Sequence, residues 1–204
     1  MKETEQIINY RSRFCKLKEI IESTNYSIIS SGEPLFCDNV NFFIKTYLIM
    51  QCVYLESYIK EVLIFYVEEI NKQIIRLKVP YNLVKWSLSL SNLIKESERN
   101  SHIDTIYKIE MTIKDIDEHI SANPYRTRVL LEHFGINLKE NKKFVQLSDK
   151  INSIVTQRNN IIHYNDDASD ISALDLIANN QIIVEYMSII DNAICSNLSN
   201  SIDR

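Results

Sequence analysis

Glycine is almost absent from this chain: only Gly32 and Gly135 occur among its 204 residues, and proline is limited to Pro34, Pro80 and Pro124. The favoured β-hairpin turns need residues that tolerate a positive φ, and glycine adopts one without steric cost. Helices joined by polar loops make no such demand. The scarcity of glycine therefore predicts an all-α fold, and the apolar periodicity divides it into a helical bundle of about 6–8 helices.

The same scarcity excludes several classes of enzyme. Phosphate-cradling loops need clustered glycines so that backbone amides can approach the phosphates, and no such cluster is present, which excludes a P-loop ATPase and a Rossmann oxidoreductase. The four cysteines form no C-x-x-C pair, so neither a zinc ribbon nor a thioredoxin-like site is indicated. We expect no cofactor and no metal.

The first third of the chain predicts two helices. Apolar residues at helical spacing predict the first from residue 3 to about residue 29, after which Gly32 and Pro34 interrupt the pattern. The second is expected to run to about residue 75 with Asp38 as its N-cap. Its middle is apolar around most of its circumference, which is typical of the central helix of a bundle, and Glu56 is a charge inside it.

Further helices are expected after Pro80. Asn123 and Pro124 are a strong helix start, because asparagine caps a helix and proline suits its first position. The segments predicted as helical are residues 81–95 (one or two short helices), 103–120, 124 to Gly135, about 139–162, and 172 to about 198. No repeat, low-complexity tract or linker divides the chain, so we expect a single domain over residues 1–204, with residues 80–120 as a candidate elaboration.

No membrane segment is expected. Residues 1–6 lack the apolar stretch of a signal peptide, and the longest uncharged run in the apolar middle, from Thr46 to Leu55, is far short of the about 20 residues of a membrane span. We therefore expect a cytoplasmic protein with reduced thiols.

The segment from Gln157 to His163, with the sequence QRNNIIH, carries the candidate chemistry. An imidazole exchanges protons near neutral pH, and a guanidinium holds a phosphate and stabilises the charge that grows on it. Together Arg158 and His163 suit the cleavage of RNA by its own 2′-hydroxyl, which needs no metal. On an ideal helix these two residues are roughly 140° apart, whereas Asn159 and His163 share a face. Arg158 must reach round, or a second copy of the protein must complete the site.

This arrangement resembles the HEPN superfamily, whose signature is an arginine, a polar residue, three to five further residues and a histidine on the penultimate helix of an all-α bundle. The tract from Asn123 to Ile136 resembles the helix and Gly-Ile segment of bacterial defence-associated HEPN proteins, including the RiboL-PSP-HEPN type. The tail from Ile171 to Ile194 resembles their long final helix. The helix carrying residues 54–60 looks like their second core helix, which often bears an acidic or polar residue that points at the site. The resemblance is loose between about residues 80 and 120.

The resemblance implies a homodimer whose two motifs face each other across a cleft and cut RNA without metal. Toxin–antitoxin and phage-defence roles are common in such families, so the implied partners are RNA, including tRNA, and a cognate antitoxin or defence-system protein. Arg158 would bind the phosphate, His163 would handle the proton, and Asn159 would orient the two, with Glu56 in support. Tyr164 departs from the small residue of many relatives, and it stands one position earlier than the tyrosine that a nucleotidyltransferase modifies in some toxins.

Plainer interpretations compete with these assignments. Arg128 and His133 show the same R-x4-H spacing, but the apolar Val129 follows the arginine, so we set that pair aside. A histidine at the end of a helix also interacts favourably with the helix dipole. Glu56 is equally well explained as a solvated partner of Lys60, one helical turn away.

The remaining histidines, His102, His119 and His133, are expected to be surface or structural residues, and the segment from Asp115 to His119 is a solvated acidic face rather than a metal site.

Charge is unevenly distributed along the chain. Residues 124–163 contain seven basic and three acidic residues, which gives this segment a net charge of +4. Because the net charge of the whole chain is −4, the other residues together carry −8. Either Lys139, Lys142 and Lys143 form a basic lip beside the motif for an RNA backbone, or they are an ordinary solvated face near a helix start. The leading hypothesis is a metal-independent endoribonuclease. Its rivals are a non-catalytic HEPN-like RNA- or protein-binding module of a defence complex and a plain helical adaptor.

Overall fold

A computed structural model describes residues 3–73, 79–90, 109 and 111–202, and this part of the chain contains helices and no strand. The all-α prediction is therefore confirmed. The helices are α1 (Glu5–Tyr26), the π-helix η1 (Ser27–Ser31), α2 (Pro34–Cys37), α3 (Val40–Gln73), α4 (Tyr81–Leu90), α6 (Ile113–Asp117), α7 (Pro124–His133), α8 (Lys142–Tyr164) and α9 (Ala173–Ile202).

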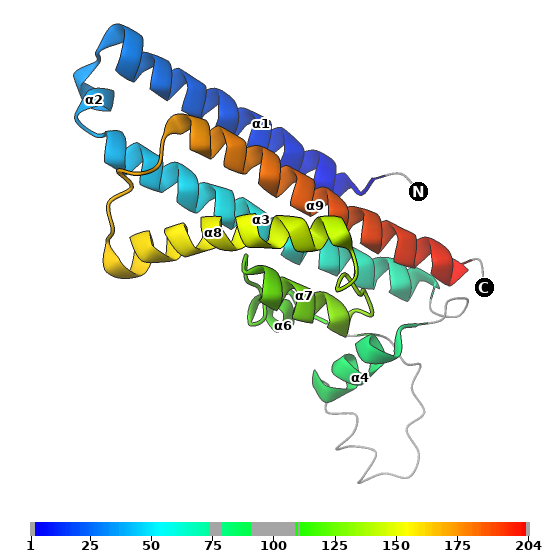
Figure 1. The fold of residues 1–204 in the computed structure, drawn as a ribbon. Coiled ribbons are helices and arrows are strands. Elements are labelled where there is room, and N and C mark those ends of the chain that lie inside the picture. The colour runs from blue at the N-terminus through cyan, green and yellow to red at the C-terminus, as the bar shows by residue number, and fades with distance from the viewer. Residues whose placement is uncertain (1–2, 74–78, 91–108, 110, 203–204) are drawn as a thin grey trace, which may run out of the picture.

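Three long helices, α1, α3 and α9, lie side by side and pack against one another (Figure 1). The fourth long helix, α8, packs on α3 and α9, and the shorter α7 packs on α8 while α6 packs on α3. The first and last described residues lie near the same end of the molecule. None of the helices in the described ranges combines the length and the apolar character that crossing a membrane requires.

The second predicted helix is the central one, as its apolar circumference indicated. α3 contacts α1, α6, α8 and α9, and several of its side chains are fully buried: Leu48, Leu55, Tyr58, Ile59, Val62, Leu63 and Tyr66. One buried carboxylate, Asp191 on α9, ties the start of the chain to this core. It accepts hydrogen bonds from the backbone N–H of Thr4 at 3.2 Å, from the Thr4 hydroxyl and from the Tyr58 hydroxyl at 3.4 Å.

Asp38 is not the N-cap of the long helix, so that prediction was wrong. Pro34 begins a short helix of its own, α2, and Asp38 closes it by donating its backbone N–H to the Pro34 carbonyl at 2.9 Å. The first helix also ends differently from the prediction. α1 ends at Tyr26, the π-helix η1 follows it as far as Ser31, and Gly32 then adopts a φ of 60°. Proline suits a first helical turn, so Pro34 starts an element here rather than only interrupting one.

Two further boundaries differ from the prediction. α8 begins at Lys142 rather than near residue 139, because the Asn141 side chain caps it by accepting the Phe144 N–H at 3.0 Å. Of the predicted helix over residues 103–120, residues 103–108 and 110 lie outside the described part. The rest contains only the short α6, which starts with a capping box between Thr112 and Asp115. Residues 91–95, the end of the predicted helical segment 81–95, also lie outside the described residues.

Candidate functional site

The C-terminal end of α8 positions the Arg-x4-His segment. The inner face of this helix is apolar and anchors it in the core through Phe144, Leu147, Ile151, Ile154, Val155 and Ile161. The helix ends because Asn165 adopts the left-handed conformation, with a φ of 52°, and donates its N–H to the Asn160 carbonyl. Lys45 of α3 donates to the side-chain oxygen of Asn165 at 3.5 Å, so the end of α8 is also tied to the central helix.

Arg158 points inward, against α3. Its Nη2 donates to Glu56 Oε1 at 2.6 Å, and the two side chains are only 19% and 28% exposed. The same carboxylate oxygen accepts the backbone N–H of Ala122 at 3.1 Å. Glu56 therefore links three segments: the central helix, the motif helix and the residues that precede α7. Lys60, the alternative partner of Glu56, pairs instead with Asp117 at 2.7 Å.

A thiol lies on the same face of α3, one turn before Glu56. Cys52 is 1% exposed, and burial raises its pKa to about 11, although the nearby charge of Arg158 opposes this shift. Cys52 is therefore a protonated thiol at neutral pH and packs as a small buried residue. The guanidinium of Arg158 is thus held against α3 by a carboxylate and flanked by a neutral group.

His163 and its neighbours have a different environment. His163 is exposed, Asn159 is half-buried, and Tyr164 is 77% exposed. Over the described ranges, no hydrogen bond joins Arg158, Asn159 or His163 to another member of this trio. Within one chain the motif therefore presents a half-buried cation and an exposed imidazole, which lie on different faces of α8 as the helical spacing predicted.

Two polar residues of α3 were missed by the sequence analysis. Asn41 donates to Asp167 at 2.8 Å and accepts the N–H of Ala168 at 2.9 Å, and Lys45 approaches Asp167 to 3.7 Å. Both hold the loop that follows His163. A signal for them exists in the sequence, because positions 41, 45, 52 and 56 fall on one face of a helix and form a polar stripe in an otherwise apolar segment.

The three lysines proposed for RNA binding, Lys139, Lys142 and Lys143, are exposed near the start of α8. α8 has 23 residues, so at about 1.5 Å per residue its two ends are about 30 Å apart. Within one chain, these lysines lie at the end of α8 opposite to His163 and not beside it.

The second pair with the same spacing lies on α7, and each member is engaged locally. Arg128 pairs with Glu132 at 3.5 Å and lies over the Tyr125 ring at 5.3 Å. His133 stacks on Trp86, with ring centroids 5.1 Å apart and an interplanar angle of 28°. His119 also contacts Trp86, and Asp115 serves in the capping box of α6, where hydrogen bonds from Thr112 lower its pKa.

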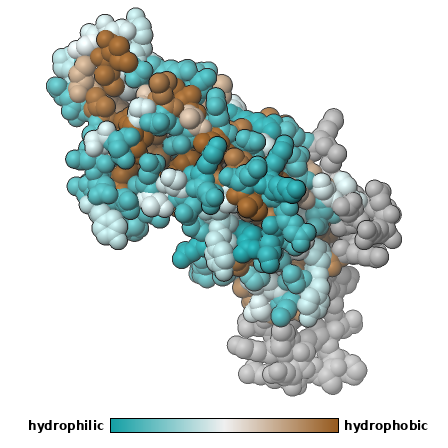
Figure 2. Space-filling view, in the orientation of Figure 1, coloured by the Kyte–Doolittle hydropathy of each residue, from teal (hydrophilic) through white to brown (hydrophobic). Residues whose placement is uncertain are grey.

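An exposed apolar surface lies near the motif end of α8. Ile162 is 49% exposed, and on the neighbouring start of α3 Val40 and Phe42 are 37% and 64% exposed. Figure 2 shows apolar side chains gathered at the end of the molecule formed by η1, α2 and the start of α3. Asn41 connects this end to the loop after His163, so the apolar surface and the motif are neighbours.

Comparison with protein families gives a match over most of the chain. The family model described as RiboL-PSP-HEPN matches residues 12–196, a range that contains Glu56 and the whole Arg-x4-His segment. Neither the curated proteins nor the solved structures provide a match to this chain.

Proposed function

This chain belongs to the RiboL-PSP-HEPN family, a family of nuclease or RNA-related modules, and on that premise we propose that it is a metal-independent endoribonuclease. We further propose that it acts as a homodimer, as a toxin or phage-defence effector that cuts RNA, including tRNA. The observation that carries the proposal is the end of α8. There a guanidinium fixed by Glu56 and an exposed imidazole are five residues apart on a helix anchored in the core.

The proposed reaction needs only the RNA and these two side chains. The 2′-oxygen of a ribose attacks the adjacent phosphorus, the bond from phosphorus to the 5′-oxygen breaks, and the products are a 2′,3′-cyclic phosphate and a 5′-hydroxyl. His163 removes the proton from the 2′-hydroxyl or supplies one to the leaving 5′-oxygen. Arg158 stabilises the negative charge that develops on the phosphate oxygens, and Asn159, one turn from His163, orients the substrate between them.

A second copy of the chain explains how Arg158 and His163 work together from different faces of α8. In a homodimer with the two motifs opposed, one His163 removes the proton and the other supplies one. The exposed Ile162, Phe42 and Val40 beside the motif offer an apolar surface for that contact. Tyr164, also exposed, would lie at the rim of the shared cleft.

A non-catalytic binding module is the second candidate, and the state of Arg158 favours it. Its amino group already donates to Glu56, and the side chain is mostly buried, as expected for an arginine whose role is to tie α8 to the carboxylate that links three segments. This candidate predicts that RNA or a partner protein binds without any product being formed, and that His163 has no effect.

The test is cleavage of a labelled RNA pool by the purified chain in excess EDTA, beside growth of cells in which the chain is induced. We expect growth arrest and fragments that end in a 2′,3′-cyclic phosphate for the wild type, and neither for His163→Ala. Arg13→Ala, which removes an exposed arginine of α1, is the matched control and should behave as the wild type. Cleavage by His163→Ala at the wild-type rate would contradict the assignment of the site. Loss of cleavage in EDTA would contradict the metal-independent mechanism.

A further inference from the structure

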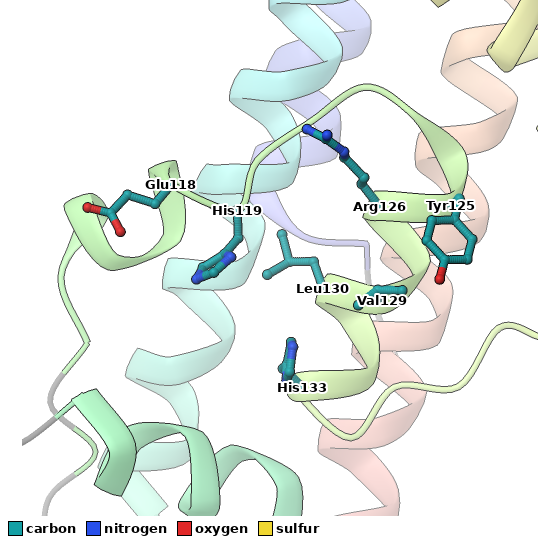
Figure 3. A pocket seen from close by; sticks show the side chains of 7 residues that line it. All are labelled: Glu118, His119, Tyr125, Arg126, Val129, Leu130 and His133. Carbon is teal, nitrogen blue, oxygen red and sulfur yellow. The ribbon is translucent and has the colours of Figure 1, made fainter.

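A hollow of about 290 Å³ lies between α6 and α7, away from the Arg-x4-His segment (Figure 3). Its lining contains the polar side chains of His119, Arg126 and His133, together with Glu118 and Tyr125, and an apolar floor formed by Val129 and Leu130. Both imidazoles lie beside the Leu130 side chain, and the carboxylate of Glu118 points away from both. Apart from the Glu118 carboxylate, the charged groups of the lining are therefore a guanidinium and two imidazoles that become cationic on protonation.

Trp86 of α4 holds the two imidazoles in place. Its ring stacks on His133 with a centroid distance of 5.1 Å and meets His119 edge-on at 5.4 Å. Burial and the charge of His119 both lower the pKa of His133. Because the charge of His119 disfavours protonation of His133, an anion bound beside both rings would favour the charged form of His133.

Arg126 adds a permanent positive charge. It is exposed and forms no ion pair with any residue in the described ranges, in contrast to Arg128 and Arg158. It is the third residue of α7, and its backbone N–H donates to the side chain of Asn123, which caps the helix. An arginine without a carboxylate partner, beside two histidines, has the donors that a phosphate group requires.

Two consecutive residues, Ala122 and Asn123, connect the hollow to the candidate catalytic site. Ala122 lies between His119 and Arg126 in the chain, and its N–H donates to the Glu56 oxygen that also binds Arg158. Asn123, the next residue, donates to Asn152 of α8 at 3.1 Å. The segments that carry the lining groups are therefore fixed to the carboxylate that positions Arg158.

We infer that this hollow is a binding subsite for single-stranded RNA, which takes one phosphate and its adjoining base from the strand that extends from the cleavage site. The inference rests on the proposed function for its substrate. Arg126, His119 and His133 bind the phosphate, and the apolar floor with the flat face of the His133–Trp86 stack receives the base. Aromatic side chains interleaved with cations are the usual means of binding a single strand without sequence preference.

The experiment uses Trp86, the single tryptophan of the chain, as the reporter, because it contacts both histidines. An unlabelled 12-nucleotide single-stranded RNA is titrated into the His163→Ala protein while the tryptophan emission is recorded at several salt concentrations. The titration is repeated with Arg126→Ala and with His119→Gln in the same background. We expect the emission to change on binding, Arg126→Ala to weaken binding about tenfold, and the salt slope to fall by about 0.7. Arg13→Ala is the control and should match the parent.

Three results would overturn the inference: no change of Trp86 emission with RNA, equal affinities for Arg126→Ala and Arg13→Ala, or saturation by uridine monophosphate at the same concentration as by the 12-mer. The last would assign the hollow to free nucleotides. Failure of the proposed function is a separate outcome. If the wild type never cleaves but Arg126 still determines binding, the chain is an RNA-binding module with this subsite. If cleavage depends on His163 but binding ignores Arg126, only the subsite is lost.

Discussion

Two segments of this protein share the spacing Arg-x4-His, one on α7 and one on α8, and their environments have little in common. On α7, Arg128 pairs with Glu132 of its own helix and His133 stacks on Trp86. On α8, Arg158 pairs with Glu56 from the central helix, and His163 is exposed at the helix end.

The difference shows which property distinguishes a candidate site from a structural pair. Helical spacing determines only the angle between two side chains, and it is the same in both segments. What differs is the origin of the arginine's partner, since a carboxylate 102 residues away fixes Arg158 relative to the whole bundle. A cation positioned by tertiary structure is preorganised for a charged ligand, whereas one held by its own helix is only locally ordered.

The largest expected difference between the two segments is in the RNA-cleavage activity of matched arginine variants. Arg158→Ala should lower the rate of RNA cleavage by about 10²–10³-fold, the usual cost of removing a group that stabilises transition-state charge. Arg128→Ala should stay within about threefold of the wild type, because its surface ion pair contributes little. Single-turnover cleavage of a labelled RNA measures both. Similar losses in the two variants would mean that the environment of the arginine does not decide its role.

The residues that follow α7 and α8 also differ in how closely they are packed. Each is followed by a residue in the left-handed conformation, Gly135 after α7 and Asn165 after α8. A Cβ on Gly135 would lie 2.5 Å from Pro80 Cβ, so Gly135→Ala combines backbone strain with a clash and should lower the free energy of unfolding by about 3 kcal/mol. Asn165→Ala adds backbone strain and removes the long hydrogen bond from Lys45 but introduces no clash, and it should lower the free energy of unfolding by about 1 kcal/mol. Urea denaturation gives both values, and a larger loss for Asn165→Ala would contradict the packing around Gly135.

The carboxylate partners provide the next test. Glu56→Gln removes the negative charge from a mostly buried pair and weakens the bond to Ala122, which should lower the free energy of unfolding by about 2 kcal/mol, below the range for fully buried pairs. Glu132→Gln removes the partner of Arg128 from the surface and should change it by less than about 0.5 kcal/mol. Chemical denaturation of both variants decides the matter. Should the two losses be equal, Arg158 would be no better fixed than Arg128.

Much of this fold follows from the sequence because its signals are local. Two glycines argued against a β fold, and Asn123, Pro124 and Gly135 marked both ends of α7 correctly. The errors occur where two local signals compete. Pro34 started a helix of its own and so changed the role of Asp38 from the N-cap of one helix to the C-cap of another.

The site was less predictable because its geometry depends on contacts between distant segments. Glu56 was recognisable as a charge within an apolar helix, but only the packing of α8 on α3 reveals that it holds Arg158. The cluster of Trp86, His119 and His133 brings together three helical regions, and no spacing in the sequence connects them. Lys45 was missed although it lies on the same stripe as Glu56, since a lysine near a helix start has an ordinary explanation at the surface.

The smallest expected effect concerns pH and the α7 histidine. The pKa of His133 is lowered by burial and by the charge of His119, while Glu132 opposes the shift. As pH falls below about 6.5, the unfolded chain therefore binds this proton before the folded chain does, and the free energy of unfolding decreases with a slope of less than one proton. Arg126 lines the same hollow, and the carboxylate of Glu118 points away from His133.

His133→Phe keeps an aromatic ring against Trp86 and removes the titration. Its unfolding free energy, measured by urea denaturation between pH 5 and 7.5, should vary less with pH than that of the wild type. Identical pH slopes would show that His133 is as freely protonated as a solvated histidine. Stacking on Trp86 would then not desolvate the His133 ring.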